Sequence, residues 1–130
     1  MLWRDGFCRI VRAPSQDYAG FCRVILNRHA REMTDLAPGE RVRLMDAVFA
    51  CESALRELFD PDKINLASLG NVVPHLHWHV IARHADDPHF PDPIWAAPRR
   101  AGVPARALRK EVSDARLGAR LAALLVQHAA

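Results

Sequence analysis

Three histidines separated by single apolar residues are the clearest chemical feature of this chain, in the run His75-Leu76-His77-Trp78-His79-Val80-Ile81. Alternation with a period of two is typical of a half-buried β-strand. On such a strand the three imidazoles share one face, with about 7 Å between successive ones, and the apolar residues face a core. A strand that served stability alone would not carry three imidazoles on one face, so we interpret this face as a functional site.

Two kinds of chemistry use clustered imidazoles. Histidine is a common metal ligand, and His-x-His pairs on strands bind zinc or iron. Such sites usually need a further carboxylate, but the nearest acids downstream lie in a proline-rich stretch without tight spacing (Asp86, Asp87 and Asp92). Direct attack by a neutral imidazole on phosphorus fits better, because neighbouring imidazoles can balance phosphate charge and protonate the leaving group. The pattern therefore favours a metal-free mechanism on an anionic substrate.

The segment from Asn65 to Ile81 reads N-L-A-S-L-G-N-V-V-P-H-L-H-W-H-V-I. It resembles the signature of the histidine triad (HIT) superfamily, His-φ-His-φ-His-φ-φ with φ apolar, and most closely its bacterial diadenosine tetraphosphate hydrolase-like branch. The resemblance covers the chain from Phe7 to Trp95. It implies hydrolysis or transfer at the α-phosphate of a nucleotide conjugate, such as a dinucleoside polyphosphate or a nucleotide phosphoramidate. The reaction would pass through a covalent nucleotidyl-histidine intermediate.

The resemblance also implies a role for each histidine. His77, the middle residue, would be the nucleophile, and His79 would contact the phosphate and the leaving group. His75 would help to hold His77 in the reactive tautomer. No metal and no cofactor are expected, and two copies would form a homodimer by extending the sheet, as HIT proteins commonly do.

Three further residues are the expected substrate contacts: Asn65, Gly70 and Asn71. By the resemblance, both asparagines fall near positions where the family uses amide side chains around the phosphate. Backbone amides around Gly70 can donate to a phosphate because glycine lets the backbone approach closely, although an ordinary loop explains this segment equally well.

The chain departs from the family pattern in two places. Relatives carry a fourth histidine on an earlier strand, where this chain has Phe21; His29 matches a less critical histidine. Residues 12–16 contain no acid to bind a ribose, and Asp17 is either a substitute or a turn residue. The alternative is therefore a weakly active or inactive nucleotide-binding module.

Composition limits the possible partners. The 130 residues fit one domain (1–130), with the motif-bearing core at 7–95 and a tail and helix at 96–130. The formal charge of +3 suits a small anionic ligand, but the basic residues are scattered and only 7% of residues are aromatic, which disfavours nucleic acid. The three cysteines suit small core residues in a reducing compartment. No leader or membrane-length apolar run is present, so we expect a cytoplasmic protein without a membrane partner.

The histidines need a scaffold, which we expect to be an α+β domain of the HIT type. The patterns predict an antiparallel sheet of about five strands, a long helix packed on it and a C-terminal helix. Expected strands are 7–11, 21–26, 63–67 and 75–81, and the expected helices are 38–59 and 106–127, the latter kinked near Ser113 or Gly118.

The long helix would begin at Pro38, a residue suited to a first helical position. Its apolar stripe has helical spacing and should face the core: Val42, Met45, Val48, Phe49, Leu55, Leu58 and Phe59. Leu76, Trp78 and Val80 should pack against this helix. Residues 84–104 are predicted to be an extended ordered tail, in which Trp95 either borders the pocket or simply packs, and Arg99 and Arg100 are solvated charges.

Overall fold

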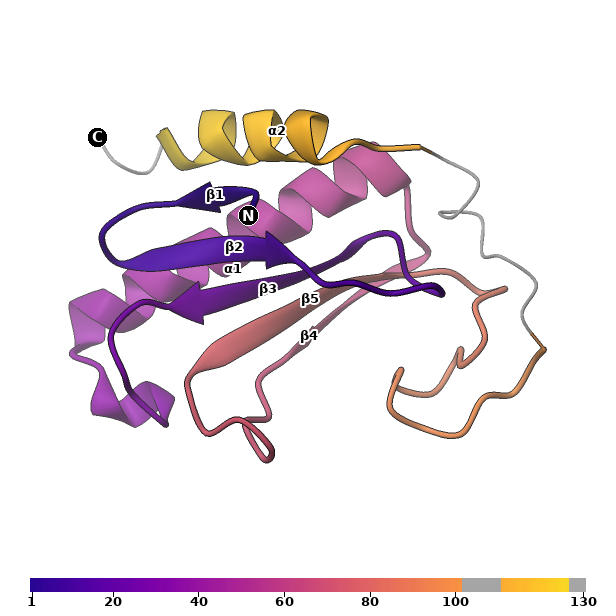
Figure 1. Cartoon of the computed structure of the whole chain (residues 1–130), viewed down its shortest axis with the longest axis horizontal. Helices are drawn as coiled ribbons and strands as arrows, with labels where there is room; N and C mark the ends of the chain where they lie inside the picture. Colours follow the sequence, from indigo (N-terminus) through magenta and orange to yellow (C-terminus); the bar gives the residue numbers. More distant parts are fainter. Residues whose placement is uncertain (102–110, 127–130) are drawn as a thin grey trace.

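The computed structural model describes residues 1–101 and 111–126. It confirms the expected α+β architecture, a five-stranded antiparallel sheet with one long helix and a C-terminal helix (Figure 1). In chain order the elements are β1 (Trp3–Arg4), β2 (Cys8–Arg12), β3 (Phe21–Leu26), the 3-10 turn η1 (Met33–Asp35), α1 (Pro38–Phe59), β4 (Lys63–Ala67), β5 (His77–Arg83) and α2 (Asp114–Val126).

The strands lie in the order β1-β2-β3-β5-β4, and every neighbouring pair is antiparallel. The histidine strand β5 therefore lies between β3 and β4 rather than at an edge. It begins at His77, two residues later than expected, so His75 precedes the strand. Pro74 lies outside the ladder, where its missing N–H leaves no pairing site empty.

Helix α1 covers one face of the sheet, and in Figure 1 it runs behind the strands while no helix in the described chain crosses the front. Pro38 is its first residue, and the Glu40 carboxylate accepts a hydrogen bond from the Ala37 N–H at 2.9 Å, which caps the helix. Leu76 and Val80 are buried against it with Trp78 partly buried, as expected.

The predicted core stripe of α1 was wrong at two positions. Val42 and Phe49 are 62% and 49% exposed, and the buried face is formed instead by Leu44, Ala47, Val48, Ala50, Cys51, Ala54, Leu55 and Phe59. Small residues occupy half of that face, so α1 can approach the sheet closely. All three cysteines, Cys8, Cys22 and Cys51, are buried and free, as small core residues.

Helix α2 packs on α1 and on β1. The Ser113 hydroxyl accepts a hydrogen bond from the Arg116 N–H at 3.1 Å, so this residue caps the helix and does not kink it. The helix continues through Gly118, where a Cβ would lie 2.7 Å from the Leu2 carbonyl oxygen. The predicted start at residue 106 lies outside the described residues.

Residues 84–101 do not form the extended tail expected from the sequence. The segment folds back, and the Arg99 and Arg100 N–H groups both donate to the Pro88 carbonyl. The Arg99 side chain pairs with Asp92, and the Arg100 side chain donates to two backbone carbonyls. Both residues are exposed to solvent, as expected for solvated charges. In the described residues no helix is both long and apolar enough to cross a membrane.

Candidate active site

The face of the sheet opposite α1, called here the histidine face, carries His77 and His79. Strand register places Phe21, Arg23 and Ile25 of β3 on this face, directly opposite Ile81, His79 and His77. The rings of His77 and His79 lie edge to face, with centroids 5.0 Å apart. Two of the three imidazoles therefore share one face and are in contact, as the alternation predicts.

The third imidazole lies elsewhere. His75 stacks on His29 at a centroid distance of 5.4 Å, and the Nδ1 atoms of the two rings are 3.3 Å apart. Its Nε2 donates to the Leu26 carbonyl at 2.6 Å. The expectation that all three rings line one strand face was wrong, because the chain turns at His75 before β5 begins. No local spacing reveals the His29 contact, since the two residues are 46 positions apart.

The backbone of His75, and not its side chain, orients His77. The Nδ1 atom of His77 lies 2.6 Å from the His75 carbonyl oxygen. A carbonyl only accepts, so Nδ1 carries the proton and the Nε2 atom of the neutral ring keeps its lone pair. The geometry therefore fixes the tautomer in which Nε2 can act as a nucleophile.

His79 is only 7% exposed and lies among aromatic rings. Phe21 lies at 5.8 Å and Trp95 at 5.0 Å from its centroid, both in edge contacts. Burial lowers the pKa of His79 to about 4, and repulsion from His77 and Arg23 adds to the shift. At neutral pH the ring is uncharged. Its buried Nδ1 has no hydrogen-bond partner in the described part of the chain.

Asn65 lies on the histidine face, opposite Ile81. Its amide oxygen accepts a hydrogen bond from Nη1 of Arg83 at 2.8 Å. The oxygen is thus already used to hold a buried arginine, although the predicted role was around the phosphate.

Of the other two expected substrate contacts, the structure places Gly70 beside the histidines but not Asn71. Gly70 has a φ of +70°, in the left-handed region that favours glycine, and it borders a cavity of about 310 Å³ that His75 and His77 also line. Asn71 is exposed and is not among the residues that line this cavity.

A buried polar network at the end of β5 was not expected from the sequence. Asp87 is fully buried and accepts two hydrogen bonds from Arg83, one from the Tyr18 hydroxyl and three from backbone N–H groups. Burial alone would raise the pKa of Asp87, but the bonds from Arg83 and the backbone lower it to about 2. The network anchors residues 84–101 and so fixes Trp95 against His79.

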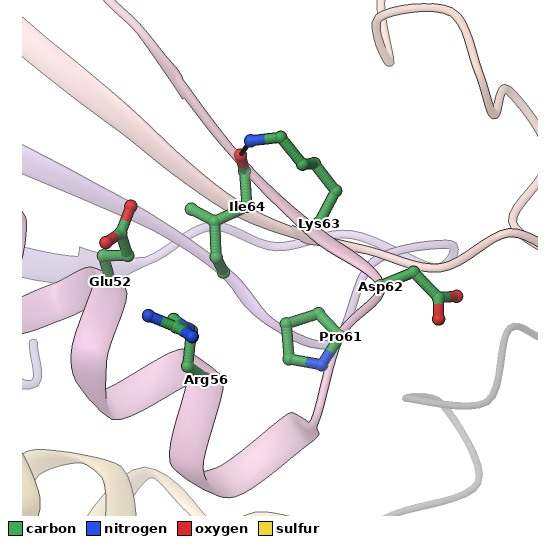
Figure 2. A pocket seen from close by; sticks show the side chains of 6 residues that line it. All are labelled: Glu52, Arg56, Pro61, Asp62, Lys63 and Ile64. Atoms are coloured by element: carbon green, nitrogen blue, oxygen red, sulfur yellow. Dashed lines mark hydrogen bonds between the residues drawn. The ribbon is translucent and has the colours of Figure 1, made fainter.

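Some other hollows in the described chain lie away from the histidines. Figure 2 shows one of them beside the end of α1 and the start of β4; it is lined by Glu52, Arg56 and Lys63 among others, and its volume is about 260 Å³. The Lys63 ammonium there donates to the Ile64 carbonyl at 2.8 Å. Within residues 1–101 and 111–126, no group of three or more His, Cys, Asp or Glu side chains is arranged to hold a metal ion.

Several solved structures of histidine triad proteins are similar to this chain. A histidine triad protein from Marinobacter aquaeolei VT8 is 30% identical, covering 97% of this chain and 88% of its own, with a TM-score of 0.72. One from Bradyrhizobium japonicum is 26% identical, covering 94% and 87%, also with a TM-score of 0.72. A Zn-bound histidine triad family protein from Mycobacterium smegmatis, 21% identical with coverages of 98% and 84%, shares the fold at a TM-score of 0.56.

A search of curated proteins gave no match. A model of the HIT domain matches residues 1–86, which include β1 to β5 and the whole histidine run. The match spans more than half of the sequence and includes both imidazoles that meet on the sheet. The chain therefore belongs to the histidine triad family of nucleotide-binding hydrolases and transferases.

Proposed function

We propose that the protein cleaves a nucleotide conjugate at its α-phosphate, with His77 as the nucleophile. The candidate substrates are dinucleoside polyphosphates and nucleotide phosphoramidates. The observation that carries the proposal is the 2.6 Å contact between Nδ1 of His77 and the His75 carbonyl oxygen. It leaves the Nε2 lone pair of His77 available beside His79.

The reaction has two steps that each form and break one bond. In the first, the Nε2 lone pair of His77 attacks the α-phosphorus, and the bond from phosphorus to the leaving group breaks. Nδ1 keeps its proton and the hydrogen bond to the carbonyl of His75, which stabilises the charge that forms on the ring. The leaving group takes a proton from solvent or from a neighbouring acid.

In the second step, a water oxygen attacks the same phosphorus and the P–N bond breaks. The products are a nucleoside monophosphate and a free His77, and the water proton passes to solvent. If another acceptor replaces water, the same intermediate gives transfer instead of hydrolysis.

Trapping the intermediate tests the proposal. The protein is mixed with diadenosine tetraphosphate or an adenosine phosphoramidate, quenched rapidly, and analysed by intact-mass and peptide mass spectrometry. We expect one nucleoside monophosphate on His77 and none on H77N. H89N is a matched control. His89 lies in the segment 84–101, outside the sheet, and its ring bonds the Tyr18 hydroxyl, so its replacement should leave the adduct unchanged.

The contact between Phe21 and His79 favours a second candidate, a nucleotide-binding module with little or no turnover. A phenyl ring there supplies neither a charge nor a hydrogen bond to a phosphate. Nucleotide binding without any adduct on the wild-type protein would support this candidate and refute the enzyme.

Metal dependence and assembly have separate tests. A metal-dependent hydrolase would lose activity with chelator, regain it with zinc and contain metal by elemental analysis. The homodimer implied by the family resemblance stays a prediction, which light scattering on the purified protein would check.

A further inference from the structure

One cation on the histidine face, Arg23, is partly buried and yet has no hydrogen-bond or ion-pair partner among the described residues. Arg23 lies on β3 directly opposite His79. Its guanidinium lies over the Phe21 ring, 5.6 Å from the centroid, and so close to the aromatic cluster around His79. Within residues 1–101 and 111–126 it has no hydrogen bond and no ion pair.

This situation distinguishes Arg23 from the other described arginines. Those that are partly or fully buried all donate hydrogen bonds: Arg9, Arg12, Arg41, Arg83 and Arg120. Those without a hydrogen bond are exposed, where water solvates the charge: Arg4, Arg31, Arg56 and Arg116. Only Arg23, in the described chain, is both partly buried and without a hydrogen-bond acceptor. Removing a guanidinium from water without an acceptor is unfavourable, so an anion there would be stabilised.

The surrounding face is cationic. Strand register places Arg4, Arg9, Lys63 and Arg83 on the same face as Arg23, and none of the strand residues on that face is Asp or Glu. Arg83 is already neutralised by Asp87, and Arg9 bonds the Asn27 amide. Of these cations, Arg23 is the one that lies beside the paired imidazoles. Its guanidinium carries five N–H donors.

His79 cannot supply the positive charge itself. Burial keeps its ring neutral near pH 7, so it can share a proton in a hydrogen bond but cannot balance a phosphate charge. A positively charged group close to the nucleophile would stabilise the non-bridging oxygens of the phosphate as negative charge develops on them in the transition state.

We infer that Arg23 is a phosphate-binding residue of this site and that its guanidinium pairs with the non-bridging oxygens of the nucleotide phosphate. The inference rests on the proposed function and adds the residue that provides the charge. It assigns the imidazoles to bond making and proton transfer, and Arg23 to charge recognition.

The test compares a nucleotide with its own nucleoside. Isothermal titration calorimetry first measures AMP, GMP, CMP and UMP on the wild-type protein, and the tightest is then compared with the corresponding nucleoside. Three variants are compared with the wild type. R23Q removes the charge, R23M removes it but keeps an aliphatic stem over Phe21, and R23K keeps the charge. R9Q is the matched control, because Arg9 shares the face but lies one strand further from β5. Thermal unfolding of each variant checks that it is folded.

We expect R23Q and R23M to bind the monophosphate about 10- to 100-fold more weakly, the range for one lost charged hydrogen-bonding group. Their affinity for the nucleoside should change by less than about twofold, R23K should be intermediate, and R9Q should match the wild type. Unchanged monophosphate affinity in R23Q and R23M would overturn the inference, as would equal losses for nucleotide and nucleoside. If the wild type binds none of the four monophosphates, the proposed function itself fails.

Discussion

Replacing Asp87 by Asn tests how the buried network holds the segment that carries Trp95. The substitution keeps the shape of the side chain and removes its charge. Asp87 and Arg83 are 0% and 2% exposed in their side chains, and their closest atoms are 2.8 Å apart. Breaking a buried ion pair from one side costs about 3–5 kcal/mol, because the remaining charge loses its partner.

Counting hydrogen bonds gives a similar figure. The Oδ2 atom accepts from Nε of Arg83 and from the His84 N–H, whereas Oδ1 accepts the remaining four bonds. If Asn keeps its oxygen at the Oδ1 position, two buried donors face an NH₂ group. Each unsatisfied donor costs about 1–3 kcal/mol, which gives about 2–6 kcal/mol in total.

The pKa of Asp87 adds a pH signature. Its folded value of about 2 lies below the ordinary value of 3.8, so the charged form stabilises the folded state. This contribution is about 2 kcal/mol, is fully present above pH 4 and is lost as the pH falls from about 4 to 2. D87N should lack that part of the acid dependence.

Urea unfolding at pH 7.5, followed by tryptophan fluorescence and circular dichroism, gives the free energies of unfolding. We expect D87N to lose about 3–5 kcal/mol of the 5–15 kcal/mol typical of a domain. D92N is the control, because Asp92 pairs with Arg99 on the surface and should lose less than about 1 kcal/mol. Losses for D87N and D92N that agree within 1 kcal/mol would refute the reasoning.

Two further predictions concern the site and the packing. In an NMR titration the His79 ring should protonate with a pKa of about 4. Because the pKa is near 6.5 in the unfolded chain, the free energy of unfolding should fall by up to about 3 kcal/mol as the pH falls from 6.5 to 4. A measured pKa above 6 would contradict the burial argument. G118A should lower the melting temperature, because its Cβ would lie 2.7 Å from the Leu2 carbonyl oxygen, whereas G39A meets open space and should not; equal melting temperatures would show that α2 moves aside freely.

The sequence was enough to predict four of the five strands, helix α1 and the paired imidazoles. Period-two alternation is a local property of a strand, so it correctly placed His77 and His79 on one face with Trp78 and Val80 toward the helix. Helix α1 was equally predictable, because Pro38 is a local signal for the first residue of a helix. The predicted stripe failed at two positions, since apolar spacing does not say how much of a helix surface the sheet covers.

The sequence by itself thus determined the family, the sheet and the two histidines that meet on it. Only the tertiary structure decided that the carbonyl of His75, and not its ring, orients His77, and that His75 instead stacks on His29. The unpartnered state of Arg23 and the contact of Trp95 with His79 also became visible only in the folded chain. The reason is physical: these contacts join segments far apart in the chain, and their geometry depends on turns and burial that leave no periodic signal in the sequence.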